Sequence, residues 1–379
     1  MSATAEMATE SLEELLHELA GSRKGKQAII AVDAPKQSLH WIGAVGQTMA
    51  AESVTSTTPY FIASIDKLYN ATISMMLAER GDLDLDQSIC NYLPESLTRG
   101  LHQYGGRDLT AEITVRHLLT HTSGLADWFE DYPKGGSNLS GIVFEEGDRT
   151  LTVEELIRHV RDHLRPHFPP QDLARRGRIR YSDTNFILVA AIIESVTGLP
   201  LHEAHTRMLY KPFNLCQTYF LDQSQSLVPT SSPMILRANG VPLHIPLLIQ
   251  SVKGIYSTAA DQMKFIRLLM KGEPFDRPET LPAMMGNWRR FGFPTDRAAL
   301  RSPNWPIEYA IGMMRFHVPR LFTPFTPIPA LYGHTGSTGC WLFYCPDLDI
   351  AMSGSVEDAA AGAVPFGTAP RILRILSKS

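Results

Sequence analysis

A serine and a lysine three residues apart are the first residues of the chain that could carry covalent chemistry. They are Ser64 and Lys67, and they open a segment whose apolar residues have helical spacing. This spacing places both side chains on one face of a helix. A serine hydroxyl attacks only when a base accepts its proton, and a lysine kept neutral by loss of hydration can be that base. Alone the pattern is weak evidence, because a surface helix with a solvated lysine also produces it.

Two later motifs add groups that could move protons and hold a substrate. Tyr181-Ser182-Asp183 supplies a phenol that can shuttle a proton, and His334-Thr335-Gly336 supplies a strand edge that a ligand can approach closely. Each motif taken alone is more often structural than functional. Their occurrence in this order after Ser64 and Lys67 favours one shared site.

With their surroundings, these motifs resemble the serine β-lactamase and penicillin-binding-protein superfamily, most of all its class C-like branch of carboxylesterases, D-peptidases and DD-peptidases. The resemblance covers nearly the whole chain. It rests on six blocks, which are FIASIDK at 61–67, LAERGDLDLDQSICNYL at 77–93, LLTHTSGL at 118–125, YSDTNFILVAAIIESVTGL at 181–199, GIYSTAADQMKF at 254–265 and YGHTGSTG at 332–339. The implied fold is α/β (α+β), with an antiparallel sheet flanked by helices and an inserted all-helical lobe.

The resemblance also implies a role for each motif residue. Ser64 would be the acylated nucleophile, Lys67 its proton acceptor, and Tyr181 the group that relays the proton to the leaving group. The backbone N–H groups of Ser64 and Ser337 would form the oxyanion hole. His334, Asp183 and Gly336 would belong with Ser337 to the substrate side of the site, and Gly336 directly precedes Ser337.

Two residues depart from the usual family pattern. His334 stands where many β-lactamases carry lysine, which points away from a dedicated β-lactamase. Asp183 replaces the asparagine that in the family contacts the substrate and the motif-one lysine, and an ionised Asp183 would favour the charged form of Lys67. Three interpretations stay open: Tyr181 is the main base, Asp183 points elsewhere, or the substrate lacks the usual amide carbonyl.

Aromatic residues flank the expected site from two irregular segments, 127–148 and 319–329. They are Trp128 and Phe129 after the LLTHTSGL block, and Phe322 and Phe325 before the third motif. Long irregular segments in compact proteins are often binding loops. If these four residues line the site, its acyl pocket is apolar.

Basic and histidine-rich segments offer weaker hypotheses. A cation among the arginines at 175–180 could lower the pKa of Tyr181 or hold a substrate carboxylate, although a solvated face is the simpler interpretation. His159 and His163 lie four residues apart and His167 follows, but Pro166 is expected to end the helix before a metal site is complete. We therefore expect no metal and no organic cofactor.

Local patterns predict the elements that must position these residues. Helices are expected at 12–19, 64–80, 115–120, 152–164, 185–197, 260–270 and 370–376, and strands at 27–33, 39–46, 309–316, 340–345 and 350–355. Both chain ends are expected to share one sheet. The predicted lobes are an α/β lobe of residues 1–75 and 240–379 and a helical lobe of residues 76–239, with the active site in the cleft between them.

Composition limits the partners of the protein. The 379 residues carry a net charge of -4, which gives no general attraction for nucleic acid. The longest apolar run, 186–193, is too short to cross a bilayer, so no membrane span is expected. The four cysteines form no C-x-x-C pair, so we expect reduced thiols. We also expect a cytoplasmic protein, because the N-terminal segment is acidic where a signal peptide would be basic: Glu6, Glu10, Glu13, Glu14 and Glu18 precede any lysine or arginine.

These observations predict a serine hydrolase that forms an acyl-enzyme at Ser64 and acts on esters of small or medium hydrophobic acids. One alternative is an acyltransferase or peptide-cyclising thioesterase that uses the same acyl-enzyme. A second is a D-peptidase, a DD-peptidase or a weak β-lactamase, and a third is a catalytically silent binding homologue. The expected partner is a small-molecule acyl substrate, and the oligomeric state is left open.

Overall fold

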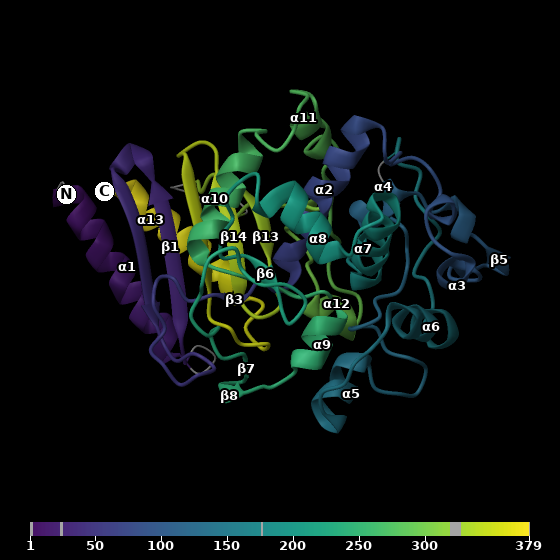
Figure 1. Ribbon diagram of the computed structural model, residues 1–379, viewed down its shortest axis with the longest axis horizontal. Helices are drawn as coiled ribbons and strands as arrows, with labels where there is room; N and C mark the ends of the chain where they lie inside the picture. The colour runs from purple at the N-terminus through teal and green to yellow at the C-terminus, as the bar shows by residue number, and fades with distance from the viewer. Residues whose placement is uncertain (1–2, 23–25, 176, 319–326, 379) are drawn as a thin grey trace.

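An antiparallel sheet of eight strands is the largest element of the computed structural model, which describes residues 3–22, 26–175, 177–318 and 327–378 (Figure 1). In spatial order the strands are β10 (Arg289–Arg290), β11 (Glu308–Tyr309), β12 (Met314–Phe316), β13 (Leu331–Thr335), β14 (Cys340–Cys345), β15 (Ile350–Ser355), β1 (Ala28–Ala34) and β2 (Leu39–Val45). The expected fold class, helices around an antiparallel sheet, is confirmed.

The two ends of the chain meet in this sheet. Strand β1 pairs with β2 on one side and with β15 on the other, in registers that place Ala28 opposite Val45 and Ile29 opposite Ser355. The strands predicted at 340–345 and 350–355 coincide with β14 and β15. The prediction that both ends share one sheet is therefore confirmed.

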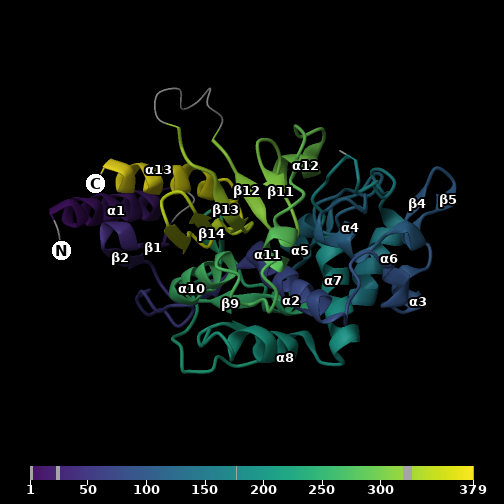
Figure 2. The same cartoon turned by 90° about the horizontal axis from the view of Figure 1, so that it is seen from above.

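Alternation along β1 sends successive side chains to opposite faces of the sheet. Ala28, Ile30 and Val32 pack with α1 (Ala3–Gly21) and α13 (Val364–Lys378), which lie side by side in Figures 1 and 2. Ile29 and Ala31 belong to the cluster that contains α2 (Asp66–Arg80) and α10 (Ala259–Met270). The sheet is thus covered by helices on both faces.

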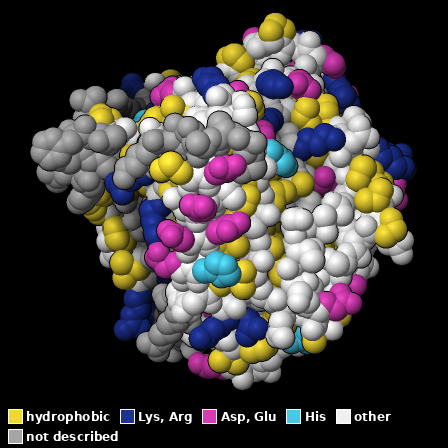
Figure 3. Space-filling model, turned by 90° about the vertical axis from the view of Figure 1, so that its left-hand side faces the viewer, with side chains coloured by type: hydrophobic (Ala, Val, Ile, Leu, Met, Phe, Trp, Pro, Cys, Tyr) yellow, Lys and Arg dark blue, Asp and Glu magenta, His cyan; other side chains and the backbone are white. Residues whose placement is uncertain are grey.

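Helix α1 is amphipathic, as its spacing predicts. Leu12, Leu15 and Leu16 are buried against the sheet. Glu10 and Glu13 are exposed on the outer side, and Figure 3 shows acidic side chains gathered on this side of the molecule. The acidic N-terminal segment therefore forms a solvated helix face.

Helix α2 passes from the sheet into a group of helices and packs against α7 (Asp183–Thr197). The further helices are α3 (Glu95–Thr98), α4 (Val115–Leu119), α5 (Leu139–Glu146), α6 (Val153–His163), α8 (Leu201–His205), α9 (Pro246–Ser251), α11 (Thr280–Met284) and α12 (Arg297–Arg301). The lobe boundaries at residues 75 and 239 stay a prediction, because one apolar core contains residues of the sheet and of these helices.

None of the described helices is by itself long and apolar enough to span a bilayer. The segments Asp183–Thr197 and Leu201–Tyr210 reach that length and composition only together, and they are bent by 74°. All four cysteines are free thiols, and Cys340 and Cys345 are buried.

The single strand predicted at 309–316 is wrong. The chain folds back there into a hairpin, in which Tyr309 of β11 pairs with Met314 of β12. Gly312 stands in the turn with a φ of +63°, and a Cβ atom at this position would collide with Ala71 of α2. The residues from 309 to 314 read YAIGMM, an apolar run that continues through the turn, so the sequence pattern alone does not reveal the reversal.

Candidate active site

One cavity of about 740 Å³ brings the predicted motifs together. Its wall includes residues from the sheet edge, from the start of α2 and α7, and from the loop after LLTHTSGL. Of the predicted site residues it contains Ser64, Lys67, Trp128, Phe129, Tyr181, Asp183, Gly336 and Ser337. Phe322 and Phe325 lie outside the described residues.

Ser64 lies in a short 3₁₀ turn, Ala63–Ile65, between β3 (Tyr60–Phe61) and α2. Ala63 has a φ of +44°, a conformation that L residues adopt rarely and that recurs at functional sites. N–H groups in a first helical turn have no acceptor within the helix. The backbone of Ser64 therefore stands where it can donate to a developing oxyanion.

The strand end that carries the third motif lies directly against the nucleophile segment. A Cβ atom on Gly336 would come within 2.8 Å of Ala63 Cβ and would also collide with Cys340 Sγ. Cys340 Sγ donates to the carbonyl oxygen of Ile62 at 3.1 Å. Only glycine permits this approach, which brings the neighbouring Ser337 to the same cavity as Ser64.

Lys67 is almost fully buried, and its Nζ lies 3.1 Å from Ser64 Oγ. The same Nζ lies 2.7 Å from a carboxylate oxygen of Asp183 and 3.6 Å from one of Asp66. Burial alone would lower the pKa of the Lys67 amine, but the two carboxylates outweigh it and hold the pKa well above its ordinary value. In the resting protein Lys67 is an ammonium that donates to the serine oxygen.

Tyr181 stands at the entry of α7 with its ring 5.4 Å below Lys67 Nζ. Burial raises the pKa of its phenol, although the charge of Lys67 and hydrogen bonds from Ser64 and Lys67 act in the opposite direction. The phenol is therefore neutral in the resting protein and can donate or accept a proton beside Ser64.

The carboxylate of Asp183 faces Lys67, so the interpretation in which Asp183 points elsewhere does not fit the geometry. Its own backbone N–H donates to Asp127 Oδ2 at 3.1 Å. Asp127 also accepts from the backbone N–H groups of Phe129 and Glu130. The side chain of Asp127 thus ties the loop after LLTHTSGL to the residue that pairs with Lys67.

Three further carboxyl groups at the cavity were missed at the sequence level. They are Asp66, Asp127 and Glu130. Burial raises the pKa of all three, and the pKa of Glu130 reaches about 7 although the cation of Arg301 opposes the shift. Asp66 lies inside the first motif, and Asp127 follows the LLTHTSGL block by two residues. Their closeness to these motifs is the sequence signal that could have identified both as site residues.

His334 lies beneath the site and does not line the cavity, which corrects the expected substrate contact. Its ring is fully buried, and Nδ1 lies 2.7 Å from the carbonyl oxygen of Thr335. A carbonyl only accepts, so the proton is on Nδ1, and Nε2 accepts from the Tyr309 hydroxyl at 3.1 Å. Burial and the nearby Lys67 lower the pKa of His334 to about 3, which keeps the ring neutral.

A segment around α12 closes another part of the cavity, and no sequence signal marked it. Arg301 pairs with Glu130 at 3.1 Å, and Trp305 also lines the wall. Arg180 is bound by Asp131 and Asp296, each at 2.7 Å, so it braces this segment. Burial raises the pKa of Tyr181 and Lys67 is the cation that opposes this shift, so the hypothesis that an arginine lowers this pKa stays a prediction.

Within the described part of the chain, no group of three or more His, Cys, Asp or Glu side chains is arranged to hold a metal ion. His159 and His163 do lie together on α6, with ring centroids 5.4 Å apart. His167 instead contacts Asp131 at 2.7 Å.

The β-lactamase family model matches residues 12–364, which is most of the chain. The chain belongs to the β-lactamase family. The resemblance inferred from the motifs is thereby confirmed. As a β-lactamase family member, the chain shares its fold with serine hydrolases whose relatives include peptidases, amidases and esterases.

Three relatives illustrate this range. A provisionally named D-alanyl-D-alanine carboxypeptidase from Salmonella gallinarum is 24% identical over 325 residues, 78% of this chain and 68% of that protein. The D-amino acid amidase from Ochrobactrum anthropi superposes with a TM-score of 0.73 at 19% identity, covering 98% of this chain and 99% of the other. EstCE1, a hydrolase with promiscuous acyltransferase activity, gives 0.70 at 18% identity, covering 99% and 100%. At these identities the two solved structures establish the fold alone.

Proposed function

We propose that the protein is a serine hydrolase that forms an acyl-enzyme at Ser64 and hydrolyses esters of small or medium hydrophobic acids. The observation that carries the proposal is the contact of 3.1 Å between Lys67 Nζ and Ser64 Oγ inside a large cavity. A volume of about 740 Å³ lies within the range of small-molecule sites.

The proton steps follow from the charges around Ser64. Lys67 acts as base in its neutral form, and Asp183 and Asp66 limit how much of that form exists at a given pH. Once neutral, Lys67 accepts the Ser64 proton as the oxygen attacks the acyl carbon. Tyr181 then donates to the leaving oxygen and regains a proton from Lys67. In the second half-reaction water takes the place of the alcohol, and the same groups act in reverse.

The wall of the cavity supports an apolar acyl group. Besides Trp128 and Phe129 it contains a run of aliphatic and aromatic side chains, including Phe61, Phe186, Ile187, Leu236, Ile245, Leu248, Ile249, Trp305 and Ile307. An ester needs less assistance than an amide, because an alkoxide leaves more readily than an amine. One oxyanion donor contributes roughly 3 kcal/mol to the transition state.

Intact-protein mass spectrometry tests the proposal. The protein is mixed with p-nitrophenyl esters, D-amino-acid amides and a penicillin, and the mass of the attached acyl group is read. We expect labelling by the esters and none in Ser64→Ala. Because Ser64 is the N-cap neither of its 3₁₀ turn nor of α2, where Ile62 and Ile65 hold that position, this variant should keep its fold. Full labelling of Ser64→Ala, or labelling by D-amino-acid amides alone, would contradict the proposal.

A further inference from the structure

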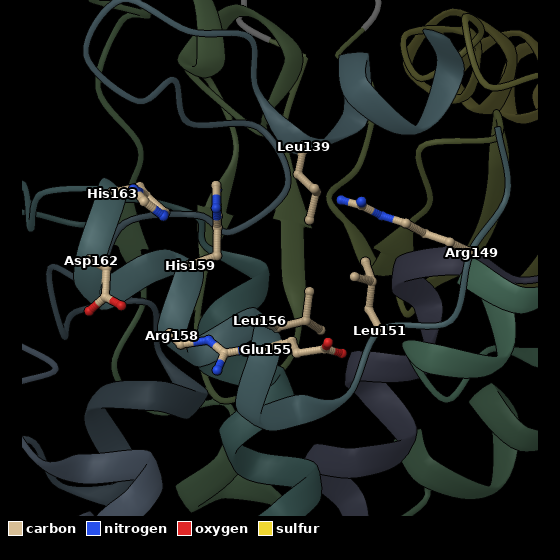
Figure 4. A pocket seen from close by; sticks show the side chains of 9 residues that line it. All are labelled: Leu139, Arg149, Leu151, Glu155, Leu156, Arg158, His159, Asp162 and His163. Atoms are coloured by element: carbon tan, nitrogen blue, oxygen red, sulfur yellow. The ribbon is translucent and has the colours of Figure 1, made fainter. Parts of the chain in front are cut away.

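A second cavity lies away from the active site, between the start of α5, the segment before α6 and the outer face of α6 (Figure 4). Its volume is about 260 Å³, several times the ~30 Å³ that one water occupies in the liquid. Its wall consists of Leu139, Arg149, Leu151, Glu155, Leu156, Arg158, His159, Asp162 and His163. None of these residues lines the active-site cavity.

The carboxylates in this wall already have partners. Glu155 accepts from the backbone N–H of Thr152 at 2.7 Å, as part of the cap that starts α6. Asp162 pairs with Arg161 at 3.0 Å, and Figure 4 shows its carboxylate directed away from the side of the cavity where Leu139 and Arg149 lie. Among the described residues neither carboxylate forms an ion pair with Arg149 or Arg158, although the charge of Glu155 interacts with both arginines over a longer distance.

The two arginines of the wall, Arg149 and Arg158, have weaker ionic contacts than the carboxylates. Arg149 has only a long contact of 3.9 Å with Glu146. Arg158 lies within ion-pair distance of no carboxylate among the described residues. Figure 4 shows the Arg149 guanidinium reaching toward the space beside Leu139. Two guanidinium groups thus stand at one small cavity with unused donors.

His159 adds a buried polar atom without a partner. Its Nε2 is shielded from solvent and makes no hydrogen bond within the described part of the chain. A shielded nitrogen without a hydrogen-bond partner is unfavourable, and a bound acceptor would remove that penalty. Burial, His163 and Arg149 lower the pKa of His159, so the free ring is neutral and can still donate one N–H.

We propose that this cavity binds a phosphate monoester with a small apolar substituent. Arginine forks match the geometry of phosphate oxygens, and the neutral imidazole supplies a further donor. The three leucines of the wall, Leu139, Leu151 and Leu156, form an apolar surface for the substituent. The site is independent of the acyl-enzyme chemistry.

Isothermal titration calorimetry of the full chain with phenyl phosphate tests the site, with inorganic phosphate and butyrate as comparisons at matched ionic strength. We expect one molecule bound per chain, with phenyl phosphate tighter than either comparison. Arg149→Gln and Arg158→Gln should each weaken binding about tenfold, the loss of one charge-assisted contact. Arg165→Gln, which removes an exposed charge just beyond α6, is the matched control and should change nothing.

A ligand at this site should also raise the pKa of His159, which NMR of the imidazole reports. Absence of saturable binding would overturn the proposal, as would equal affinities in Arg149→Gln and Arg165→Gln. Butyrate or inorganic phosphate binding as tightly as phenyl phosphate would overturn the assignment to a phosphate monoester.

Discussion

At the scale of single residues, the site is governed by the charge state of Lys67. Its Nζ contacts Ser64 Oγ and two carboxylates at once, so the group that accepts the serine proton in the proposed mechanism is held in its protonated form. The base becomes available as pH rises through the raised pKa of Lys67. Activity should therefore increase toward alkaline pH, and the carboxylate of Asp183 should set where the increase begins.

Replacing Asp183 by asparagine tests this control. Asparagine removes the nearest negative charge and so lowers the pKa of Lys67, while Asp66 still acts on it. The acidic limb of the kcat/KM profile for an ester should move to lower pH, as stopped assays across the pH range would measure. Asp347→Asn, a change of equal charge at an exposed turn, should leave the limb in place. An unmoved limb in Asp183→Asn would remove Asp183 from the proton equilibrium.

His121, in the LLTHTSGL block, is a positioning residue. Its Nδ1 lies 3.2 Å from the backbone N of Ser182 and 3.1 Å from Asn185 Nδ2, and both of these groups are donors. Nδ1 is therefore an unprotonated acceptor. The ring also lies 4.4 Å from the ring of Tyr181, measured between centroids. His121 consequently holds the start of α7 and the phenol in one arrangement.

Two substitutions of His121 separate this acceptor role from bulk packing. Asparagine can place Oδ1 where Nδ1 stands, and it tolerates the φ of +55° observed here. Glutamine instead places its amide where Nε2 stands. We expect kcat in His121→Asn to exceed that in His121→Gln by about tenfold, the value of roughly one buried hydrogen bond. Equal kcat values at equal thermal stability would contradict a specific role for Nδ1.

At the scale of elements, the sequence patterns predict most helices and strands but not how the chain turns between them. The helix at 152–164 appears as Val153–His163, because its capping box and apolar spacing are local. The hairpin of β11 and β12 was not predictable in this way, since the contact that requires Gly312 comes from α2. The site residues of the motifs were found by type and spacing, whereas the α12 segment has no local signature.

The place of His334 shows the same limit. Its strand β13 was recognised by its motif, yet alternation along the strand decides which side chains face the cavity. His334 points to the buried side, toward Tyr309, while Ser337 follows beyond the strand end and reaches the cavity. The adjacent Thr335 does line the cavity, so one position along the strand separates a buried support from a lining residue.

Glu357 joins two elements around the nucleophile. It lies just beyond β15, is fully buried, and accepts from the backbone N–H of Phe61 at 3.2 Å and from the Ser355 hydroxyl at 2.9 Å. Burial raises the pKa of this carboxyl from 4.5 to about 8, although both hydrogen bonds oppose the shift. The folded protein therefore favours the protonated form of Glu357. This carboxyl group contacts β3, the strand that leads to Ser64.

The raised pKa of Glu357 makes stability depend on pH with a definite sign. Its contribution is present below the unfolded pKa near 4.5 and is lost as pH rises to about 8. Glu357→Gln stays neutral at every pH. At about pH 9 its melting temperature should therefore exceed that of the wild type by a few degrees, whereas at about pH 5 the two melting temperatures should be similar. Glu52→Gln is the exposed control. Parallel melting curves for Glu357→Gln and wild type across this range would contradict the raised pKa.

At the scale of the whole molecule, the cavity is made by segments that are distant in sequence. Ser64 follows the short strand β3, Lys67 lies on α2, Tyr181 precedes α7, and Ser337 follows β13. Side chains of the α12 segment complete the wall across from the sheet. The volume and the apolar lining of the cavity are therefore properties of the assembled fold.

This assembled wall predicts a preference for longer acyl chains. Each buried CH₂ contributes roughly 0.8 kcal/mol, so two methylenes give ~1.6 kcal/mol when they are fully buried at the transition state. The kcat/KM of p-nitrophenyl butyrate should exceed that of the acetate by about tenfold. Penicillin and D-alanyl peptides should react far more slowly, because Asp183 is engaged with Lys67 and presents no amide to them.

Variants in one loop locate the source of the preference. Phe129 lines the cavity and packs on Trp128, with ring centroids 5.0 Å apart, whereas Tyr132 is 41% exposed and is not part of the wall. Phe129→Ala should reduce the butyrate to acetate ratio several-fold, since apolar contact with the longer chain is lost. Tyr132→Ala should keep the ratio of the wild type. Two results would favour the peptidase alternative: a preference for the acetate ester, or cleavage of D-alanyl peptides faster than every ester tested. In either case the binding energy would come from polar recognition and not from this apolar wall.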